Sequence, residues 1–370
     1  MTAQYVLYGG SHSLFTGKAR AYLRYKGVAF REESATRDVY KRIILPRVGA
    51  PIVPVLITPD GECVQDTTDI IDLLETRYPA SPVYPEAPLQ RLVALMLEVF
   101  GDEWLTIPAM HYRWSVLDQQ YDFIMGEFGR MSHPEAEPDE AIALGEKLSQ
   151  PFSGMLPPLG VTEATIPGIE KAYLQLLDDL EAHFRGHDYL LGSRPSIGDY
   201  GLMGPLYAHL ARDPVPKALM QSRAPAVYAW VERMNDPIVL SGDFLPDDAV
   251  PDTLLPVLGM MCRDQLPDIA GVIAANAAFV EANPGADVPR FLGMQPFQFG
   301  SARGERVISS YAQWLFQRPW GHYQSLSGDA RTAADELLAS VGGEHAFSEP
   351  IRHRLERKSG QLELVEASTS

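Results

Sequence analysis

Seven short elements follow one another in the first 80 residues, and their order constrains the fold more than any other feature of the chain. Apolar runs of strand type alternate with segments of helical spacing, and two apolar runs flank the turn "PDGE" as in a hairpin. The order β-α-β-α-β-β-α predicts a compact mixed domain in which helices cover a small sheet. The expected strands are 4–8, 28–33 and the two arms of 53–65, and the expected helices are 16–27, 37–44 and 67–79.

Four prolines in the eleven residues "YPASPVYPEAP" indicate a linker after this domain. Beyond it helical patterns dominate, and one long helix is expected from about Leu89 towards Met125. A proline- and acid-rich insertion follows near 128–167, and Ser196 with Asp199 fits a later N-capping box. Helix candidates after Phe244 are 254–282, 305–317 and 329–340. The expected parts are a mixed domain at 1–79, a linker at 80–88, a helical domain at 89–243 and a helical C-terminal extension at 244–370.

The net charge of −17 argues against a general nucleic-acid or anionic-membrane binder. The first 48 residues are nevertheless basic, with nine basic and three acidic side chains. This segment could attract a small anion, or it could form a solvated helix face. No apolar run approaches the roughly 20 residues of a membrane span, and the first residues lack the pattern of a signal peptide. A cytoplasmic location is therefore expected.

Metal and disulfide chemistry have little support in the sequence. Cys63 and Cys262 are the only cysteines, so neither a disulfide scaffold nor a Cys-rich metal site is expected. His183 and His187 have a spacing that can bind a metal on a helix, but Gly186 lies between them and no third ligand is evident. The absence of a C-x-x-C motif disfavours a dithiol oxidoreductase.

Three segments of the first domain place polar groups where a ligand could bind. The turn "YGGSHSLFTGK" is rich in hydroxyl groups, and Pro54 opens the strand in "IVPVL", because proline cannot donate to a sheet. In "QDTTDII", Asp66 or Thr67 stands at a helix start, where free N–H groups favour an anion. Either residue could cap the helix, and the Asp66 carboxylate could also accept hydrogen bonds from a ligand's ammonium group.

Together these segments resemble the N-terminal thioredoxin-like domain of cytosolic glutathione transferases, in their serine and cysteine branch. The family's S/C-P-F-x-x-K-V-R appears here as "SLFTGKAR", with Leu14 in place of proline, and its V-P-V-L is intact. Its E-S-x-x-I appears as "DTTDI", and "LLGSRPSIGDYGLMGPL" resembles the G-x-x-P-S-x-A-D signature of the helical second domain. The resemblance covers roughly residues 4 to 240. It implies an α/β thioredoxin-like domain followed by an all-α domain, to which this chain adds the extension.

The resemblance also implies a glutathione site that uses no metal. The Val53 backbone would pair with the cysteinyl part of glutathione, helped by a cis bond before Pro54. Asp66 and Thr67 would hold the amine and the carboxylate of the γ-glutamyl group. Lys41 or Arg47 would bind the glycyl carboxylate of glutathione.

A hydroxyl group near the first helix is expected to activate the glutathione thiol. A free thiol has a pKa of about 8.5, and a hydroxyl that donates a hydrogen bond to sulfur lowers it. Ser13 is the direct match to the family motif and Ser11 is the second choice. His12, Thr16 and Tyr8 are further alternatives.

The second substrate and the role of the extension are less constrained by the sequence. Tyr112 and Trp114, with Trp104, could line a pocket for an electrophile, or they could belong to the core. The aromatic segment 311–324 of the extension could pack over that pocket, or it could cover a surface that other family members use for dimerisation. The expected activity is conjugation of glutathione to a small apolar electrophile, or reduction of one. The alternatives are a non-catalytic binding or scaffold protein, and a homodimer is one expectation.

Overall fold

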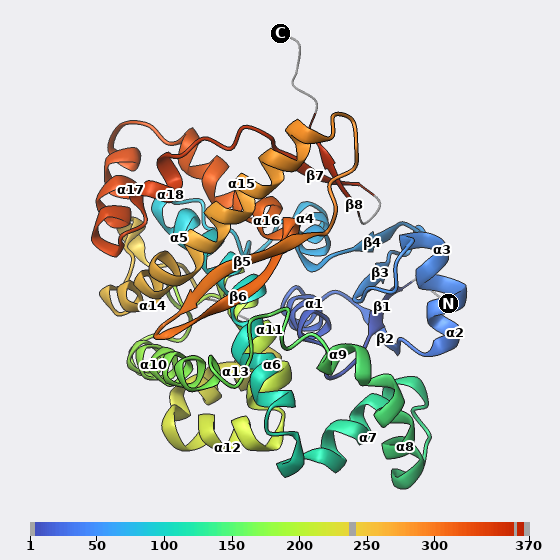
Figure 1. The fold of residues 1–370 in the computed structure, drawn as a ribbon. Helices are drawn as coiled ribbons and strands as arrows, with labels where there is room; N and C mark the ends of the chain where they lie inside the picture. The colour runs from blue at the N-terminus through green and yellow to red at the C-terminus, as the bar shows by residue number, and fades with distance from the viewer. Residues whose placement is uncertain (1–3, 237–241, 359–360, 366–370) are drawn as a thin grey trace.

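The computed structural model describes residues 4–236, 242–358 and 361–365 (Figure 1). Its N-terminal domain has the predicted order of elements around a four-stranded sheet with strand order β2-β1-β3-β4. Strand β1 pairs parallel to β2 and antiparallel to β3, which pairs antiparallel to β4. The elements are β1 (Tyr5–Gly9), α1 (Leu14–Tyr25), β2 (Phe30–Ser34), α2 (Arg37–Val39), a π-helical turn (Tyr40–Ile44), α3 (Leu45–Val48), β3 (Val55–Ile57), β4 (Cys63–Gln65) and α4 (Thr67–Arg77).

Helices α1 and α4 bury their apolar faces between the sheet and the helical domain. Leu23 of α1 and Ile70 and Leu74 of α4 are fully buried, as the spacing of their apolar residues predicts. Ser13 caps α1, since its Oγ accepts a hydrogen bond from the Thr16 amide at 3.3 Å. Asp66 caps α4 in the same way, accepting from the Thr68 amide at 2.9 Å.

In the helical domain, the expected single long helix from Leu89 to Met125 is wrong. A π-helical turn and a 3₁₀ turn divide this segment, and in the π turn Gly101 packs directly on the backbone of Gly201 in α11. The predicted capping box is present, with the Asp199 carboxylate accepting from the Ser196 amide at 2.8 Å. The elements are α5 (Pro88–Val99), the π turn (Phe100–Trp104), α6 (Thr106–Trp114), a 3₁₀ turn (Leu117–Gln119), α7 (Tyr121–Ser132), α8 (Pro138–Leu148), α9 (Gln150–Ser153), α10 (Ile166–Phe184), α11 (Ile197–Pro205), a second π turn (Leu206–Ala211), α12 (Pro214–Arg223) and α13 (Pro225–Asn235).

The C-terminal extension contains the expected helices and also two β-hairpins that we did not predict. The helix expected at 305–317 begins only at Ser310, because 302–309 pairs with the preceding strand and buries Phe297 and Phe299. Helix α16 packs on α5 and α15 packs on α16, and Figure 1 shows the β7–β8 hairpin beside α4. The elements are 3₁₀ turns (Pro246–Asp248 and Asp252–Leu254), α14 (Leu255–Met260), a π turn (Met261–Gln265), α15 (Leu266–Ala282), β5 (Phe291–Phe299), β6 (Ala302–Ser309), α16 (Ser310–Ser325), α17 (Gly328–Val341), α18 (Glu344–Ser348), β7 (Leu355–Lys358) and β8 (Gln361–Leu364).

Candidate functional site

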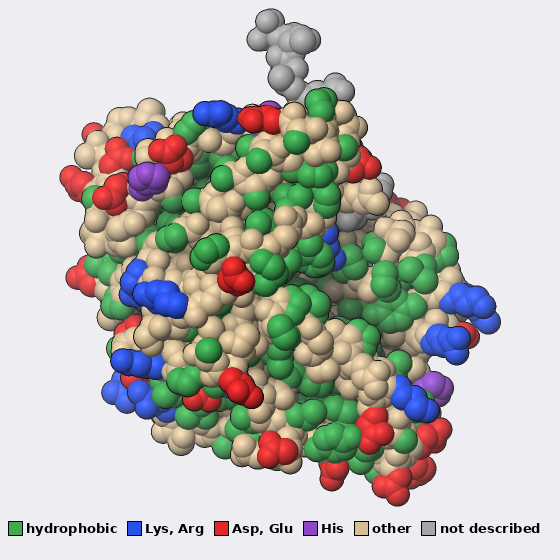
Figure 2. Space-filling view, in the orientation of Figure 1, with side chains coloured by type: hydrophobic (Ala, Val, Ile, Leu, Met, Phe, Trp, Pro, Cys, Tyr) green, Lys and Arg blue, Asp and Glu red, His purple; other side chains and the backbone are tan. Residues whose placement is uncertain are grey.

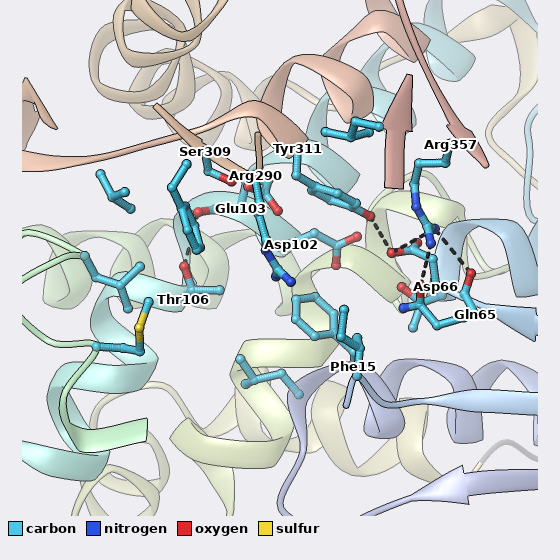
Figure 3. Close-up of a pocket in the computed structure, with 18 of the residues that line it drawn as sticks. Phe15, Gln65, Asp66, Asp102, Glu103, Thr106, Arg290, Ser309, Tyr311 and Arg357 are labelled. Atoms are coloured by element: carbon cyan, nitrogen blue, oxygen red, sulfur yellow. Dashed lines mark hydrogen bonds and ion pairs between the residues drawn. The ribbon is translucent and has the colours of Figure 1, made fainter. Parts of the chain in front are cut away.

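A cavity of about 680 Å³ lies where the N-terminal domain, the helical domain and the extension meet. Figure 2 shows the corresponding hollow, with hydrophobic side chains around it, and Figure 3 shows the polar side chains inside. All three parts of the chain line it. Of the aromatic segment 311–324 that was expected to pack over a pocket, Tyr311 lines the cavity, and the rest of the extension's lining comes from 287–309 and 357–362.

Three short segments make the N-terminal wall of the cavity. They are Leu14–Phe15 at the start of α1, Val53–Pro54 before β3 and Asp66–Thr67 at the start of α4. The peptide bond between Val53 and Pro54 is cis, as the resemblance implied. Among the described residues, the Val53 amide and carbonyl have no backbone partner, so both can pair with an extended peptide.

The candidate hydroxyl groups lie in different surroundings. Ser13 is half-buried and directly precedes Leu14 in the sequence. Because its Oγ accepts a hydrogen bond from the Thr16 amide, its own hydroxyl proton can be donated elsewhere. Ser11 is exposed and donates to Glu127 at 3.1 Å. The Thr16 hydroxyl is buried and accepts the Gly10 amide at 3.4 Å.

None of Ser13, Ser11, Thr16, His12 and Tyr8 is among the residues that line the cavity, although Ser13 directly precedes Leu14, which does. The His12 ring packs on Phe128 at 4.4 Å, and burial lowers its pKa to about 3, so it is neutral at physiological pH. Tyr8 lies in a small apolar cluster on the other face of the sheet, with Val55.

Four predicted binding residues lie away from the cavity. Lys41 and Arg47 are exposed, and the Arg47 guanidinium donates to the Ile43 carbonyl of its own helical turn. Tyr112 and Trp114 do not line the cavity, contrary to the expected electrophile pocket. Both are buried in the core, where Tyr112 packs against Tyr173 and Trp114 packs against Phe128. The side chains of α6 that do line the cavity are Thr106 and Met110.

Asp66 is held by two side chains of the extension, as the dashed lines of Figure 3 show. The Tyr311 hydroxyl donates to Asp66 Oδ2 at 2.7 Å, and an Arg357 nitrogen lies 3.4 Å from the same oxygen. Arg357 also pairs with Asp69 at 2.8 Å and donates to the Gln65 carbonyl at 3.2 Å. We did not anticipate Tyr311 or Arg357, since nothing in the local sequence pairs them with residues more than 240 positions away.

Two consecutive acids, Asp102 and Glu103, face the cavity from the π turn after α5 (Figure 3). The Asp102 carboxylate forms an ion pair with the buried Lys18 ammonium at 2.5 Å, and Lys18 also forms one with Glu98 at 3.0 Å. Burial raises the pKa of Asp102 to about 7 and that of Glu103 to about 8. We did not single out these acids, although two adjacent carboxylates in an otherwise apolar helix are a signal that could have found them.

Other functional classes find little support in the part of the chain that the structure describes. No group of three or more His, Cys, Asp and Glu side chains there could hold a metal ion. His183 instead bonds to Thr253 at 2.8 Å, and its ring stacks on His187. No helix within the described ranges is both long enough and apolar enough to span a bilayer.

Comparisons with known proteins agree with this architecture. Residues 7–82 match the N-terminal domain of glutathione S-transferase, and residues 160–236 match its C-terminal domain. A Tau class glutathione S-transferase from mango (Mangifera indica) is 17% identical, with 68% of this chain and 95% of that chain covered and a TM-score of 0.41. A glutathione transferase from Phanerochaete chrysosporium is 16% identical, with 64% and 98% covered and a TM-score of 0.44. The search of curated proteins gave no match. Because both domains are present in order, the chain belongs to the glutathione S-transferase superfamily.

Proposed function

We propose that the cavity binds glutathione and that the protein is a glutathione transferase-like enzyme, which activates the thiolate for attack on an electrophile. One observation carries the proposal: the start of α1, the Val53–Pro54 bond and the start of α4 line the same wall. All three segments lie within residues 7–82, which match the N-terminal domain of glutathione S-transferase, and they carry the motifs that resemble those of the family.

The wall suits an extended tripeptide with charged ends. The free amide and carbonyl of Val53 would pair with the cysteinyl residue. The γ-glutamyl carboxylate would lie at the N-terminus of α4, near Thr67, where unpaired N–H groups favour an anion. A carboxylate with two oxygens can accept about four hydrogen bonds, so Asp66 keeps capacity for the ligand ammonium beside Thr68, Tyr311 and Arg357.

Ser13 is the proposed donor to the glutathione sulfur. Its free hydroxyl proton and its place at the α1 N-terminus both favour a thiolate. One charge-assisted hydrogen bond is worth about 1.5 kcal/mol, or roughly one unit of thiol pKa. The thiolate would then add to, or displace a group from, the second substrate.

A second candidate is a binding protein without catalysis, and the contacts of Asp66 favour it. Arg357 already balances the charge of the carboxylate that would receive the glutathione ammonium, and the Tyr311 hydroxyl donates a hydrogen bond to it. With these contacts in place, glutathione would bind weakly or only at its cysteinyl end. We also propose that the protein is cytoplasmic and forms a homodimer. Light scattering on a sizing column checks the homodimer.

Calorimetry with glutathione, followed by ultraviolet absorbance of the bound thiolate against pH, separates the candidates. We expect binding at millimolar glutathione, with a thiol pKa below that of free glutathione. Ser13→Ala should raise this pKa by about one unit, whereas Ser11→Ala, two positions earlier and exposed, should not. Failure to bind would sink the transferase proposal, and binding with an unchanged thiol pKa would favour the non-catalytic one.

A further inference from the structure

Two arginines of the extension line the cavity on the side opposite the N-terminal wall. Arg306 of β6 is buried and partnered: it pairs with Asp268 at 3.3 Å and lies 4.8 Å over the Trp104 ring. Arg290, just before β5, has no ion pair and no side-chain hydrogen bond with any described residue. In Figure 3 it reaches from the extension towards Phe15 of α1. Arg290 is exposed to solvent and lines the cavity beside Asp287, and among the described residues neither side chain forms an ion pair.

Glu103 is a cavity acid that could balance Arg290, and at neutral pH it carries a proton. Its carboxyl has no hydrogen-bond partner among the described side chains, and burial raises its pKa to about 8. The charged groups around it are Arg306 on β6, Arg290 before β5, Asp102 on the same turn and Asp66 at the start of α4, and the Tyr311 hydroxyl of α16 also faces it. A protonated Glu103 leaves the Arg290 charge uncompensated, and its O–H can donate a hydrogen bond.

The remaining lining beside these groups is largely apolar. Side chains from the first domain, from α6 and the segment after it, and from the extension enclose the space. Arg290 itself is exposed to solvent, so an ion pair made there gains only part of the strength of a fully buried pair. These apolar side chains are Leu14, Phe15, Ile52, Met110, Phe152, Met155, Leu159, Val288, Phe291 and Val307.

We propose that Arg290 binds a carboxylate group of the second substrate, whose apolar body packs against Phe15 and Met110. The substrate class is then an amphipathic carboxylic acid that bears the electrophilic carbon, rather than the neutral apolar electrophile expected from the sequence. The inference rests on the proposed function only in naming this ligand the second substrate. Glutathione carries carboxylates of its own, so the test must separate the two sources.

Calorimetry with 4-phenylbutyrate and with its alcohol, 4-phenylbutanol, tests the site, each measured with and without glutathione. At pH 7 we expect the carboxylate to bind about tenfold more tightly than the alcohol, the ratio given by one charge-assisted hydrogen bond. Arg290→Gln should remove this ratio without changing the affinity for the alcohol. The matched control is Arg303→Gln on the same hairpin, since Arg303 is exposed and donates only to backbone carbonyls.

Glu103→Gln supplies an independent arm of the test. In the wild type, affinity for the carboxylate should fall about tenfold between pH 7 and pH 9, as Glu103 ionises. The Gln variant keeps only the titration of Asp102, whose charge is paired with Lys18, and should lose much less affinity over this range. Equal binding of the two probes, equal loss in the Arg303 control, or a loss of glutathione affinity in place of phenylbutyrate affinity would overturn the inference. If glutathione fails to bind while the phenylbutyrate results hold, the proposed function fails and the carboxylate site stands.

Discussion

The Glu103 carboxyl should make the stability of the protein depend on pH in an unusual direction. Its pKa rises from an ordinary 4.5 to about 8 in the folded chain. Between these values the folded state binds more protons than the unfolded state, so stability falls as pH rises. Each pH unit is worth about 1.36 kcal/mol, which gives roughly 3 kcal/mol by pH 7 and about 5 kcal/mol above pH 8 as upper bounds. Water in the cavity will reduce both values.

Glu103→Gln removes this titration while keeping the size of the side chain. Urea unfolding followed by tryptophan fluorescence at pH 5, 7 and 9 should show the variant nearly equal to the wild type at pH 5. It should be about 2 kcal/mol more stable at pH 7 and more so at pH 9. Glu305→Gln, on the exposed side of β6, should give the same small difference at every pH. A pH-independent difference for Glu103→Gln would refute the reasoning, because it would mean that Glu103 ionises normally in the folded protein.

Three further predictions test the surroundings of the cavity. Lys18→Met leaves the buried Glu98 and Asp102 without their cation and should lower the free energy of unfolding by about 3–5 kcal/mol. The control Arg42→Met breaks an exposed ion pair and should lower it by less than about 1 kcal/mol. Similar losses in the two variants would contradict the buried network. Tyr311→Phe removes a donor that competes for Asp66 and should tighten glutathione binding about tenfold in calorimetry, whereas weaker binding would show that Tyr311 supports the site. Gly101→Ala would place a Cβ 2.2 Å from the Gly201 backbone and should cost about 3 kcal/mol in thermal unfolding, while Gly259→Ala, with open space in α14, should be neutral or stabilising; a neutral Gly101 variant would refute the close packing.

The N-terminal domain could be predicted because its elements are specified by local patterns. Its strands, its hairpin and the two capped helices each follow from fewer than 15 neighbouring residues. The helix expected from Leu89 to Met125 could not be divided from its own sequence, since the break at Phe100–Trp104 accompanies a contact with Gly201. The β5–β6 hairpin was missed for a related reason. The side chains of residues 305–309 show the in-and-out alternation of a strand in their pairing with β5. The sequence of 305–309 together with 310–317 favours a helix.

The candidate site divides in the same way. Val53, Pro54, Asp66 and Thr67 belong to sequence motifs, and the structure brings these predicted residues to one wall. The groups opposite them come from the extension, and their pairing depends on where a segment more than 200 residues later returns to the first domain. No local pattern carries that information. Tyr112 and Trp114 show the converse, because aromatic residues on one helix fill a core as readily as they line a pocket.

Under the proposed function, this division of the cavity has a consequence for how glutathione and a second substrate would be selected. The wall proposed for glutathione is built by the first domain from backbone groups and helix starts, which change little when side chains change. The opposite wall is built by side chains of the extension, where Arg290 and Asp287 form no ion pair with a described residue. Because substitutions at Arg290 and at Ser13 lie on separate elements and share no contact, their effects on binding should be nearly additive. Selectivity for the second substrate can therefore change through the extension alone, while the glutathione side of the cavity stays as it is.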